Sequence, residues 1–216
     1  EIANLCEQVD ANVQDVARGI GLDGRIGAKF LHAGPGYGGS CFPKDTLALL
    51  RTAEGLNLPM NIVKATVEVN DQRKRDMAQK VIDACGGSLA GKTIAVLGLT
   101  FKPNTDDMRD SPSLDIIPAL IAAGARVRAH DPEGMDEARG MLTGIEFCDD
   151  AYATLADADA LAIITEWNAY RALDLPRVKD LMKAPVMIDM RNIYDPANMR
   201  EQGFSYFSIG RPAVQP

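Results

Sequence analysis

The sequence predicts an α/β protein in which a helical region precedes a Rossmann-like, doubly wound parallel sheet. Apolar residues recur at helical spacing through the first part of the chain, and from residue 92 onward short aliphatic runs alternate with helical stretches. Strands that alternate with helices are typical of parallel sheets, which bind ligands at the carboxyl ends of their strands. We therefore divide the chain into a helical region, 1–87, and an α/β domain, 88–216.

Four helices are expected in the helical region, over residues 2–9, 13–20, 45–55 and 60–85. Asp10 separates the first two, and glycines follow or close the others, as is common at helix ends. The charged centre of the long helix, 71–76, reads DQRKRD and is interpreted as a solvated helix face rather than a binding patch.

The α/β domain is expected to begin with a strand over 92–101, whose continuous apolar run is typical of a buried parallel strand. A helix over 111–124 follows, in which Ser111 suits the N-cap, Pro112 the first turn and Gly124 the end. Five further strands are expected, within residues 125–131, 144–150, 158–167, 184–191 and 204–210.

The composition narrows the classes of partner. The chain has 216 residues, of which 46% are hydrophobic and 25% charged, and its net charge is −7. An acidic chain of this kind is a poor binder of nucleic acid or of an anionic membrane, although a local basic site for a small anion is compatible with it. No apolar run is long enough to cross a bilayer, and the N-terminal stretch does not resemble a signal peptide, so we expect a cytoplasmic protein.

The cysteines and histidines do not form a metal-binding pattern. Neither the four cysteines nor the two histidines have the spacing of a zinc site, so we expect no metal and no disulfide framework. Cys6, Cys85 and Cys148 lie among apolar neighbours and are expected to be buried. Only Cys41 has an unusual setting.

Cys41 lies within the segment GPGYGGSCFPKD, 34–45, in which four glycines precede the thiol. Glycines allow a left-handed backbone and let amide N–H groups crowd a ligand, so the segment could hold a diphosphate or an oxyanion. Pro43, Lys44 and Asp45 are expected to begin a helix, which places the thiol just ahead of a positive helix end that favours the thiolate. Asp45 could accept a proton or position water. The alternative is a tight loop with an incidental cysteine.

The turn after the first strand of the α/β domain lacks the dinucleotide-binding fingerprint. Only Gly98 of the G-x-G-x-x-G pattern is present, because Thr100 and Pro103 occupy the other two positions. The turn instead carries Lys102 and Arg109, which either contact phosphate oxygens or are plain surface cations. Asp131, at the end of the second strand, occupies the place of a ribose-binding acid, but its spacing from Gly98 is longer than usual. This pattern indicates a nucleotide site rebuilt for something other than NAD.

The segment FLHAGPGYGGSCFPKDTLAL, 30–49, resembles the active-site segment of the UDP-glucose 6-dehydrogenases, in the UDP-glucose/GDP-mannose dehydrogenase family. The resemblance continues in ARGIGLDGRIG before it and in GLTFKPNTDDMRDSPS, AHDP and MIDMRNIYD after it, and covers essentially the whole chain. It implies an NAD-dependent oxidoreductase that converts the C6 alcohol of UDP-glucose to a carboxylate with two NAD⁺ and one water. A cysteine thiohemiacetal and then a thioester would be the intermediates.

The resemblance also implies roles for individual residues. Cys41 would be the nucleophile and Asp45 would orient or activate water, while Lys44 and Arg109 would contact NAD. The remaining matched positions would bind the UDP-sugar, the loop largely through its backbone, and Arg25 would reach the substrate of the neighbouring subunit; these positions are Arg25, Phe30, Leu31, His32, Ala33, Gly34, Gly38, Lys102 and Arg191.

The family pattern further implies that this chain is the C-terminal portion of the enzyme. The family begins with an NAD-binding domain that carries the fingerprint glycines, whereas this chain starts within a helix. We accordingly expect 1–87 to be a central, dimerising helical region with the cysteine loop, and 88–216 to be a UDP-sugar-binding domain. A homodimer through the central helices is expected.

Three interpretations remain open. The parent protein oxidises UDP-glucose, which Phe42 and the segment GPGYGGSC favour; or it oxidises another sugar nucleotide, such as GDP-mannose or UDP-N-acetylmannosamine. Alternatively, this chain by itself is a non-catalytic binding and dimerisation module. We expect the first to describe the parent and the third to describe the isolated chain.

Overall fold

The computed structural model describes all 216 residues and contains one six-stranded sheet, in the order β3-β2-β1-β4-β5-β6. Each neighbouring pair of strands is parallel, which confirms the α/β fold. The strands are β1 (Thr93–Leu97), β2 (Arg126–His130), β3 (Ile145–Phe147), β4 (Ala160–Ile163), β5 (Val186–Asp189) and β6 (Ser205–Ser208). The chain runs outward in one direction from β1 to β3 and in the other from β4 to β6, so β1 and β4 flank the switch point at which such sheets bind ligands.

The two central strands explain the continuous apolar runs of the sequence. Every residue of β1 and of β4 is buried. Alternate side chains point to opposite faces, so Ile94 and Val96 enter one core cluster while Ala95 and Leu97 enter the other. A central strand covered by helices on both faces therefore needs no polar alternation.

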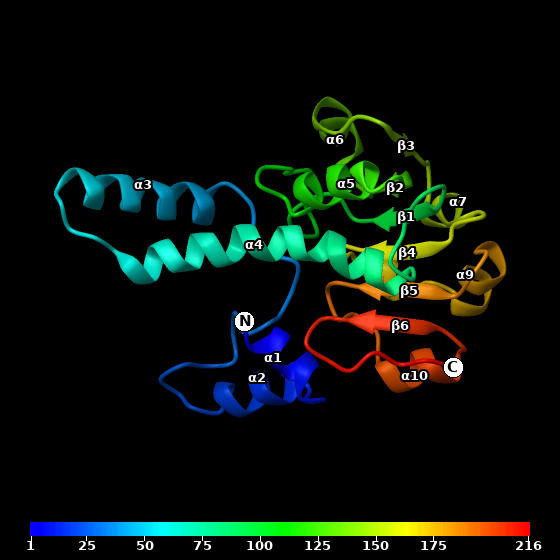
Figure 1. Cartoon of the computed structure of the whole chain (residues 1–216), viewed down its shortest axis with the longest axis horizontal. Helices are drawn as coiled ribbons and strands as arrows, with labels where there is room; N and C mark the ends of the chain where they lie inside the picture. Colours follow the sequence, from blue (N-terminus) through cyan, green and yellow to red (C-terminus); the bar gives the residue numbers. More distant parts are fainter.

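Ten helices surround the sheet and extend beyond it (Figure 1). Those of the first part are α1 (Ile2–Gln8), α2 (Val13–Gly21), α3 (Cys41–Gly55) and α4 (Asn61–Ala84). Those connecting or flanking the strands are α5 (Ser113–Ala122), α6 (Met135–Met141), α7 (Ala151–Leu155), α8 (Asn168–Arg171), α9 (Leu175–Leu181) and α10 (Pro196–Glu201).

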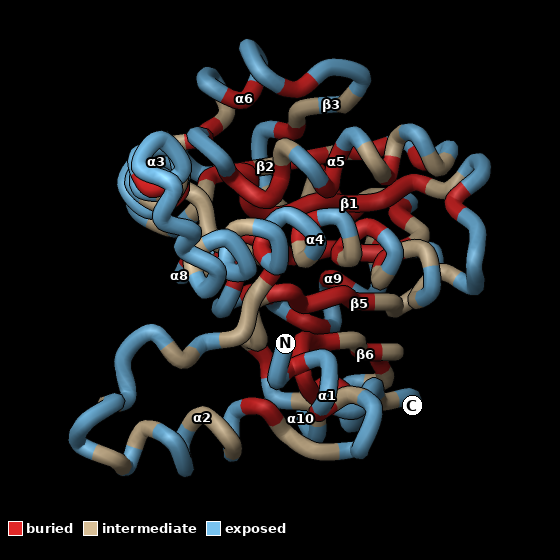
Figure 2. Tube along the Cα trace, turned by 60° about the vertical axis from the view of Figure 1, so that its left-hand side comes forward, coloured by how far each residue is buried: buried red, intermediate tan, exposed pale blue.

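Helix α4 joins the two parts of the molecule. Met77, Ala78 and Val81 in its second half enter the core cluster that covers one face of the sheet, next to α5. Its first half pairs with α3 in a hairpin that projects away from the sheet in Figure 1 and is mostly exposed in Figure 2. The same core cluster takes in Ala3, Cys6 and Val13 of α1 and α2. The division at residues 87 and 88 stays a prediction.

Helices α1 and α2 are attached to the segment that follows β6. The Gly210 amide donates to Glu7 Oε1 at 2.7 Å, and the Val13 amide donates to the Gly210 carbonyl at 2.7 Å. Because Gly210 has φ of +66° and Val13 side-chain atoms fill the space beside it, glycine permits this close approach.

Three local expectations differ from the structure. Helix α3 begins at Cys41 rather than at Pro43, so the thiol belongs to the first helical turn. Helix α5 begins only at Ser113; the hydroxyl of Ser111 accepts from the Ser113 amide at 3.4 Å, as expected of a capping residue, and also donates to the Leu99 carbonyl at 2.6 Å. Cys6 and Cys148 are buried as expected, whereas Cys85 is only half-buried because it ends α4.

Candidate active site

The cysteine loop, residues 34–40, is packed against the loop that follows β1. The amide of Gly39 donates to the Arg109 carbonyl at 2.7 Å. A Cβ on Gly38 would lie 2.8 Å from the carbonyl carbon of Asp110, and one on Gly39 would lie 2.7 Å from the Phe101 ring. These two glycines are therefore required because another backbone and an aromatic ring approach them closely, in addition to any contact with a ligand.

Cys41 is exposed at the start of the 15-residue helix α3. The Ser40 hydroxyl is its hydrogen-bonding neighbour, with Oγ 3.7 Å from Sγ. Amide groups in the first turn of a helix lack intrahelical partners and carry partial positive charge, which favours an oxyanion there. Asp45 lies four positions later, on the same helix face as Cys41. Its carboxylate is exposed and forms an ion pair with Lys44 at 3.4 Å.

The β1–α5 loop, residues 98–112, carries the two cations predicted to contact phosphates. The guanidinium of Arg109 donates two hydrogen bonds to Asp107, at 2.9 and 2.8 Å. This pairing raises the pKa of Arg109 and lowers the pKa of Asp107. Lys102 Nζ lies 5.1 Å from the centre of the Phe101 ring. Since Phe101 also packs on Gly39, the loop with the cations and the loop with the thiol form one surface.

Arg191 is a mostly buried cation at the edge of the site. It follows β5, at the carboxyl edge of the sheet, and its side chain is 16% exposed. The guanidinium donates to the carbonyls of Ile164 and Phe101, and its Nε lies 3.0 Å from the carboxylate of Glu166. Its Nη1 lies 3.3 Å from the position of a Cβ on Gly34. Burial lowers the pKa of Arg191, and the charge of Glu166 opposes that shift.

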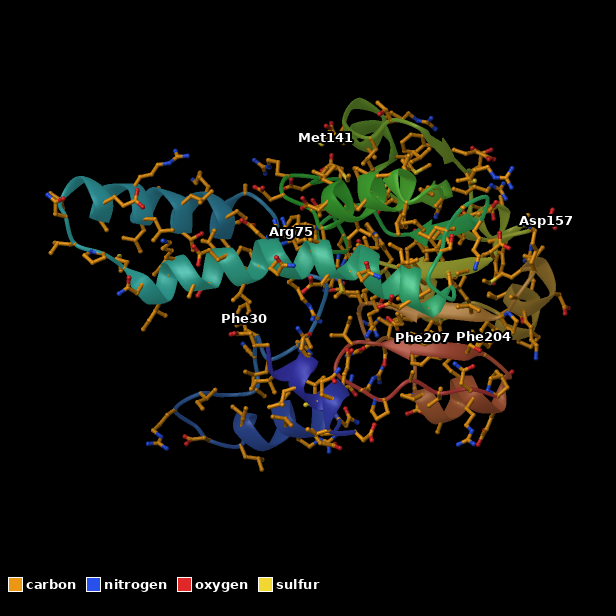
Figure 3. All side chains as sticks on the ribbon, in the orientation of Figure 1. Phe30, Arg75, Met141, Asp157, Phe204 and Phe207 are labelled. Atoms are coloured by element: carbon orange, nitrogen blue, oxygen red, sulfur yellow. The ribbon has the colours of Figure 1, made fainter.

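The segment 30–34, predicted to wrap a sugar nucleotide, leads into the cysteine loop. Its members Phe30, Leu31, His32, Ala33 and Gly34 all line a cavity of about 640 Å³, together with residues of α1, α2 and α4. Phe30 has φ of +64° and is 98% exposed as a residue. Figure 3 shows its side chain between α4 and the α1–α2 pair.

Arg25 is the one predicted site residue that the structure does not bring to the cysteine loop. It lies on the exposed turn after α2, where its guanidinium donates to both carboxylate oxygens of Asp23. No hydrogen bond or ion pair connects it to the other predicted residues. A role toward a neighbouring subunit, as the resemblance implies, is compatible with this position and stays a prediction.

The charged centre of α4, 71–76, is only in part the solvated face expected from the sequence: Asp71, Gln72 and Arg75 are exposed, whereas Lys74 is buried. The Lys74 side chain is only 7% exposed, and Asn70 is buried. Asn70 exchanges two hydrogen bonds with the backbone of Tyr37, at 2.8 and 3.2 Å, and Arg73 Nε donates to the Gly34 carbonyl at 3.0 Å. The sequence did contain a signal: Asn70 and Lys74 continue toward the N-terminus the helical row that Met77, Ala78 and Val81 place in the core.

Asp131 does not have the ribose-binding role that its position suggested. One of its carboxylate oxygens accepts from the amides of Leu99 and Thr100 and from Trp167 Nε1, and the other accepts from the amides of Glu133 and Gly134. Asp131 is only 1% exposed and its carboxylate is occupied by these internal donors, so it holds together the loops that follow the strands.

The carboxyl edge of the sheet does not fit a dinucleotide. Beside Gly98, where a pyrophosphate would need open backbone, the Thr165 side chain lies 2.5 Å from the position of a Cβ. Asp131 is unavailable to a ribose. No group of three or more potential ligand side chains is placed to hold a metal ion, and none of the helices is both long and apolar enough to cross a bilayer.

Comparisons with known proteins match both parts of the chain. Residues 1–72 match the central domain of the UDP-glucose/GDP-mannose dehydrogenase family, and residues 95–196 match the UDP binding domain of the same family. The UDP-glucose 6-dehydrogenase of Rhizobium meliloti (strain 1021) is 63% identical over 212 residues, which are 98% of this chain and 48% of that protein. The chain thus spans about half the length of the curated relatives it matches.

Two solved structures share the fold over nearly all of this chain. A UDP-glucose dehydrogenase from the hyperthermophilic archaeon Pyrobaculum islandicum has a TM-score of 0.83 and 37% identity, covering 95% of this chain and 45% of that one. An NDP-N-acetyl-D-galactosaminuronic acid dehydrogenase from Methanosarcina mazei Go1 has a TM-score of 0.85 and 30% identity, covering 97% of this chain and 46% of that one.

Proposed function

Because the chain belongs to the UDP-glucose/GDP-mannose dehydrogenase family, we propose that it supplies the cysteine side of an active site that oxidises the C6 hydroxyl of UDP-glucose to a carboxylate. The observation that carries the proposal is the hydrogen bond from the Gly39 amide to the Arg109 carbonyl. It fixes an exposed thiol next to a loop that carries cations suited to a diphosphate.

The UDP-sugar would lie across these two loops. Lys102 is available to the diphosphate as a point charge. The backbone of residues 30–34 and of Gly38 would contact the rest of the nucleotide sugar. Arg191 would contact the nucleotide sugar from below the 30–34 segment through Nη1, which lies next to Gly34. Its other two guanidinium nitrogens already bind Ile164, Phe101 and Glu166.

Cys41 would provide covalent catalysis. After the C6 alcohol has lost a hydride and a proton, the thiolate sulfur attacks the aldehyde carbon, and the aldehyde oxygen takes up a proton to give a thiohemiacetal. Loss of a second hydride and the hydroxyl proton converts that adduct to a thioester. Water, oriented by Asp45 on the same helix face, then attacks the thioester carbon, the carbon–sulfur bond breaks, and the thiolate returns with a carboxylate product. The amides at the start of α3 would stabilise the oxyanions.

NAD is proposed as the acceptor of both hydrides. The edge of this sheet does not fit a dinucleotide, so the cofactor would be held mainly by residues outside this chain. Lys44 and Arg109 are exposed near Cys41 and would contact it only from one side. We therefore expect this chain to bind substrate but not to turn it over alone.

Sequence identity to relatives, rather than similarity of fold, favours UDP-glucose over other sugar nucleotides as the substrate. The two solved structures have nearly equal TM-scores although their names give different substrates. The relative with 63% identity carries the name UDP-glucose 6-dehydrogenase. GDP-mannose or UDP-N-acetylmannosamine is the alternative.

We also propose that two copies associate through the helical region. Of the large apolar side chains that are well exposed, all but Met141 lie within residues 2–69. Such a concentration is typical of a surface that is covered in an assembly. A cytoplasmic location is proposed because all four cysteines are free thiols.

Calorimetry and turnover assays test the proposal. This chain should bind UDP-glucose more tightly than GDP-mannose, and tighter binding of GDP-mannose would contradict the choice of substrate. Mixed with UDP-glucose and NAD⁺, it should form no NADH, and sustained turnover would contradict the shared site.

In a complete enzyme containing the chain, Cys41→Ser should block the formation of UDP-glucuronate, and undiminished formation would exclude the thiol as nucleophile.

A further inference from the structure

Two buried polar side chains of α4 lie directly beneath the cysteine loop. Asn70 and Lys74 are one helical turn apart, and a Cβ on Gly36 would lie 3.0 Å from both the Asn70 amide oxygen and Lys74 Cγ. Gly36 has φ of +127°, so the loop needs glycine here both for its backbone conformation and for its closeness to these side chains. The Asn70 side chain hydrogen-bonds to both backbone groups of the next residue, Tyr37: its Oδ1 accepts from the Tyr37 amide and its Nδ2 donates to the Tyr37 carbonyl.

Lys74 connects the same helix to the β1–α5 loop. Its ammonium donates to the Asp110 carbonyl at 3.0 Å and lies 3.5 Å from the carboxylate of Asp115, which is about half exposed. A buried ammonium with a single, partly exposed carboxylate partner is not an efficient source of stability, because its desolvation opposes the pairing. Its geometry therefore points to a role in holding parts of the site in place.

The cysteine loop and α4 both donate hydrogen bonds to one turn of the β1–α5 loop, at the adjacent carbonyls of residues 109 and 110. The Arg109 carbonyl accepts from Gly39 of the cysteine loop, and the Asp110 carbonyl accepts from Lys74 of α4. Asp110 has φ of +50°, an uncommon conformation for a residue other than glycine. The turn thus joins three elements: the cysteine loop, the loop with the two exposed cations, and α4.

We propose that Asn70 and Lys74 are positioning residues for Cys41, which set the position of the thiol relative to a substrate held by Lys102 and the 109–110 turn. The inference rests on the proposed function for the identity of the nucleophile, but the contacts themselves concern the cysteine loop whether or not it is catalytic. Loss of either side chain should let the loop shift, which misplaces the thiol more than it weakens binding of the nucleotide.

The first test measures amide hydrogen exchange in this chain. Lys74→Met removes the ammonium while keeping a long apolar stem, and Asn70→Ala removes both bonds to Tyr37. We expect each to raise exchange at least several-fold at Tyr37 and Gly39, with exchange in β1 and β4 unchanged. Lys74→Arg should restore protection, because a guanidinium can still donate to Asp110. Arg75→Met is the matched control, since Arg75 is exposed on the same helix (Figure 3).

The second test measures turnover in the complete enzyme. A misplaced nucleophile costs up to about 100-fold in rate, so Lys74→Met should lower kcat by about that order while KM for UDP-glucose changes less than about threefold. Lys74→Arg should recover most of kcat, and Arg75→Met should behave as the parent.

Three results would overturn the inference. One is unchanged exchange at Gly39 in both Lys74→Met and Asn70→Ala. Another is a parallel rise in β1 and β4, which would mean that these side chains support the whole domain rather than the loop. The third is a rise in KM with kcat unchanged. If Lys74→Met does not fold, Asn70→Ala decides by the same criteria. Failure of the proposed function would appear separately, as an active Cys41→Ser enzyme.

Discussion

The backbone of Asp110 occupies the space in which a Cβ of Gly38 would lie, so these two residues fix how closely the cysteine loop approaches the β1–α5 loop. Gly38 is not among the glycines with positive φ, which means that its lack of a side chain, rather than its backbone freedom, is what the site uses. The same contact places the Gly39 amide within hydrogen-bonding distance of Arg109.

Gly38→Ala should therefore separate the two loops. Overpacking of this kind costs about 1–3 kcal/mol, and here the obstructing atoms are backbone, which cannot rotate away. We expect a lower free energy of unfolding in urea and weaker binding of UDP-glucose by calorimetry. Gly24→Ala is the matched control, because nothing lies within 4 Å of the position of its Cβ. Equal effects of the two substitutions would show that the Gly38–Asp110 contact does not matter.

Arg191→Met should be destabilising. It leaves the Glu166 carboxylate, whose Oε2 has no hydrogen bond and whose side chain is 28% exposed, without its ion-pair partner. Breaking a fully buried pair costs about 3–5 kcal/mol, so we expect a smaller loss for this partly exposed one. The double variant Glu166→Gln with Arg191→Met should recover part of the loss, because it removes the unpaired charge. The free energies of unfolding of the four proteins form a double-mutant cycle, and additive effects would contradict the coupling.

The sequence predicted the sheet better than it predicted the connections between distant segments. The buried runs of β1 and β4 identify parallel strands because both faces of the sheet are covered. Ser111 shows the limit of local preference: its hydroxyl oxygen accepts from the Ser113 amide, as its place before Pro112 suggests, but the same hydroxyl also donates to the Leu99 carbonyl. Local capping preferences do not predict this second bond to another part of the chain.

The residues of the candidate site also differ in how well the sequence predicted them. Cys41 and its glycines could be singled out because their residue types and spacing are unusual. Lys74 was harder to find: its position in the helical row of Met77 and Val81 indicates burial, but a lysine in a charged helical stretch is normally solvated. The loops that cover it, 34–40 and 98–112, come from other parts of the chain. Asp131 likewise suits a ribose until its internal donors are known.

The Asp107–Arg109 pair should make stability depend on acid pH. The hydrogen bonds from Arg109 lower the pKa of Asp107 below its unfolded value of about 3.9. The pair therefore contributes its full stability above about pH 4, and this contribution is lost as pH falls through the folded pKa. Asp107→Asn should show a smaller fall in free energy of unfolding between about pH 6 and pH 3. Asp106→Asn, at an exposed neighbour without an ion pair, is the control, and an identical pH dependence in both would rule out the linkage.

A charge on the exposed apolar surface of the helical region should prevent association of two copies. Ile62, in the first turn of α4, is 85% exposed and lines the cavity between α4 and the 30–34 segment. Burial of a carboxylate at an interface is costly, so Ile62→Glu should give a monomer by sedimentation analysis where the parent chain gives a dimer. Because Ile62 is almost fully exposed within one copy, the fold should be unaffected, as circular dichroism can verify. Arg126→Glu, at an exposed position of β2 outside the helical region, controls for the added charge; a monomeric parent, or a dimer that survives Ile62→Glu, would contradict the proposed surface.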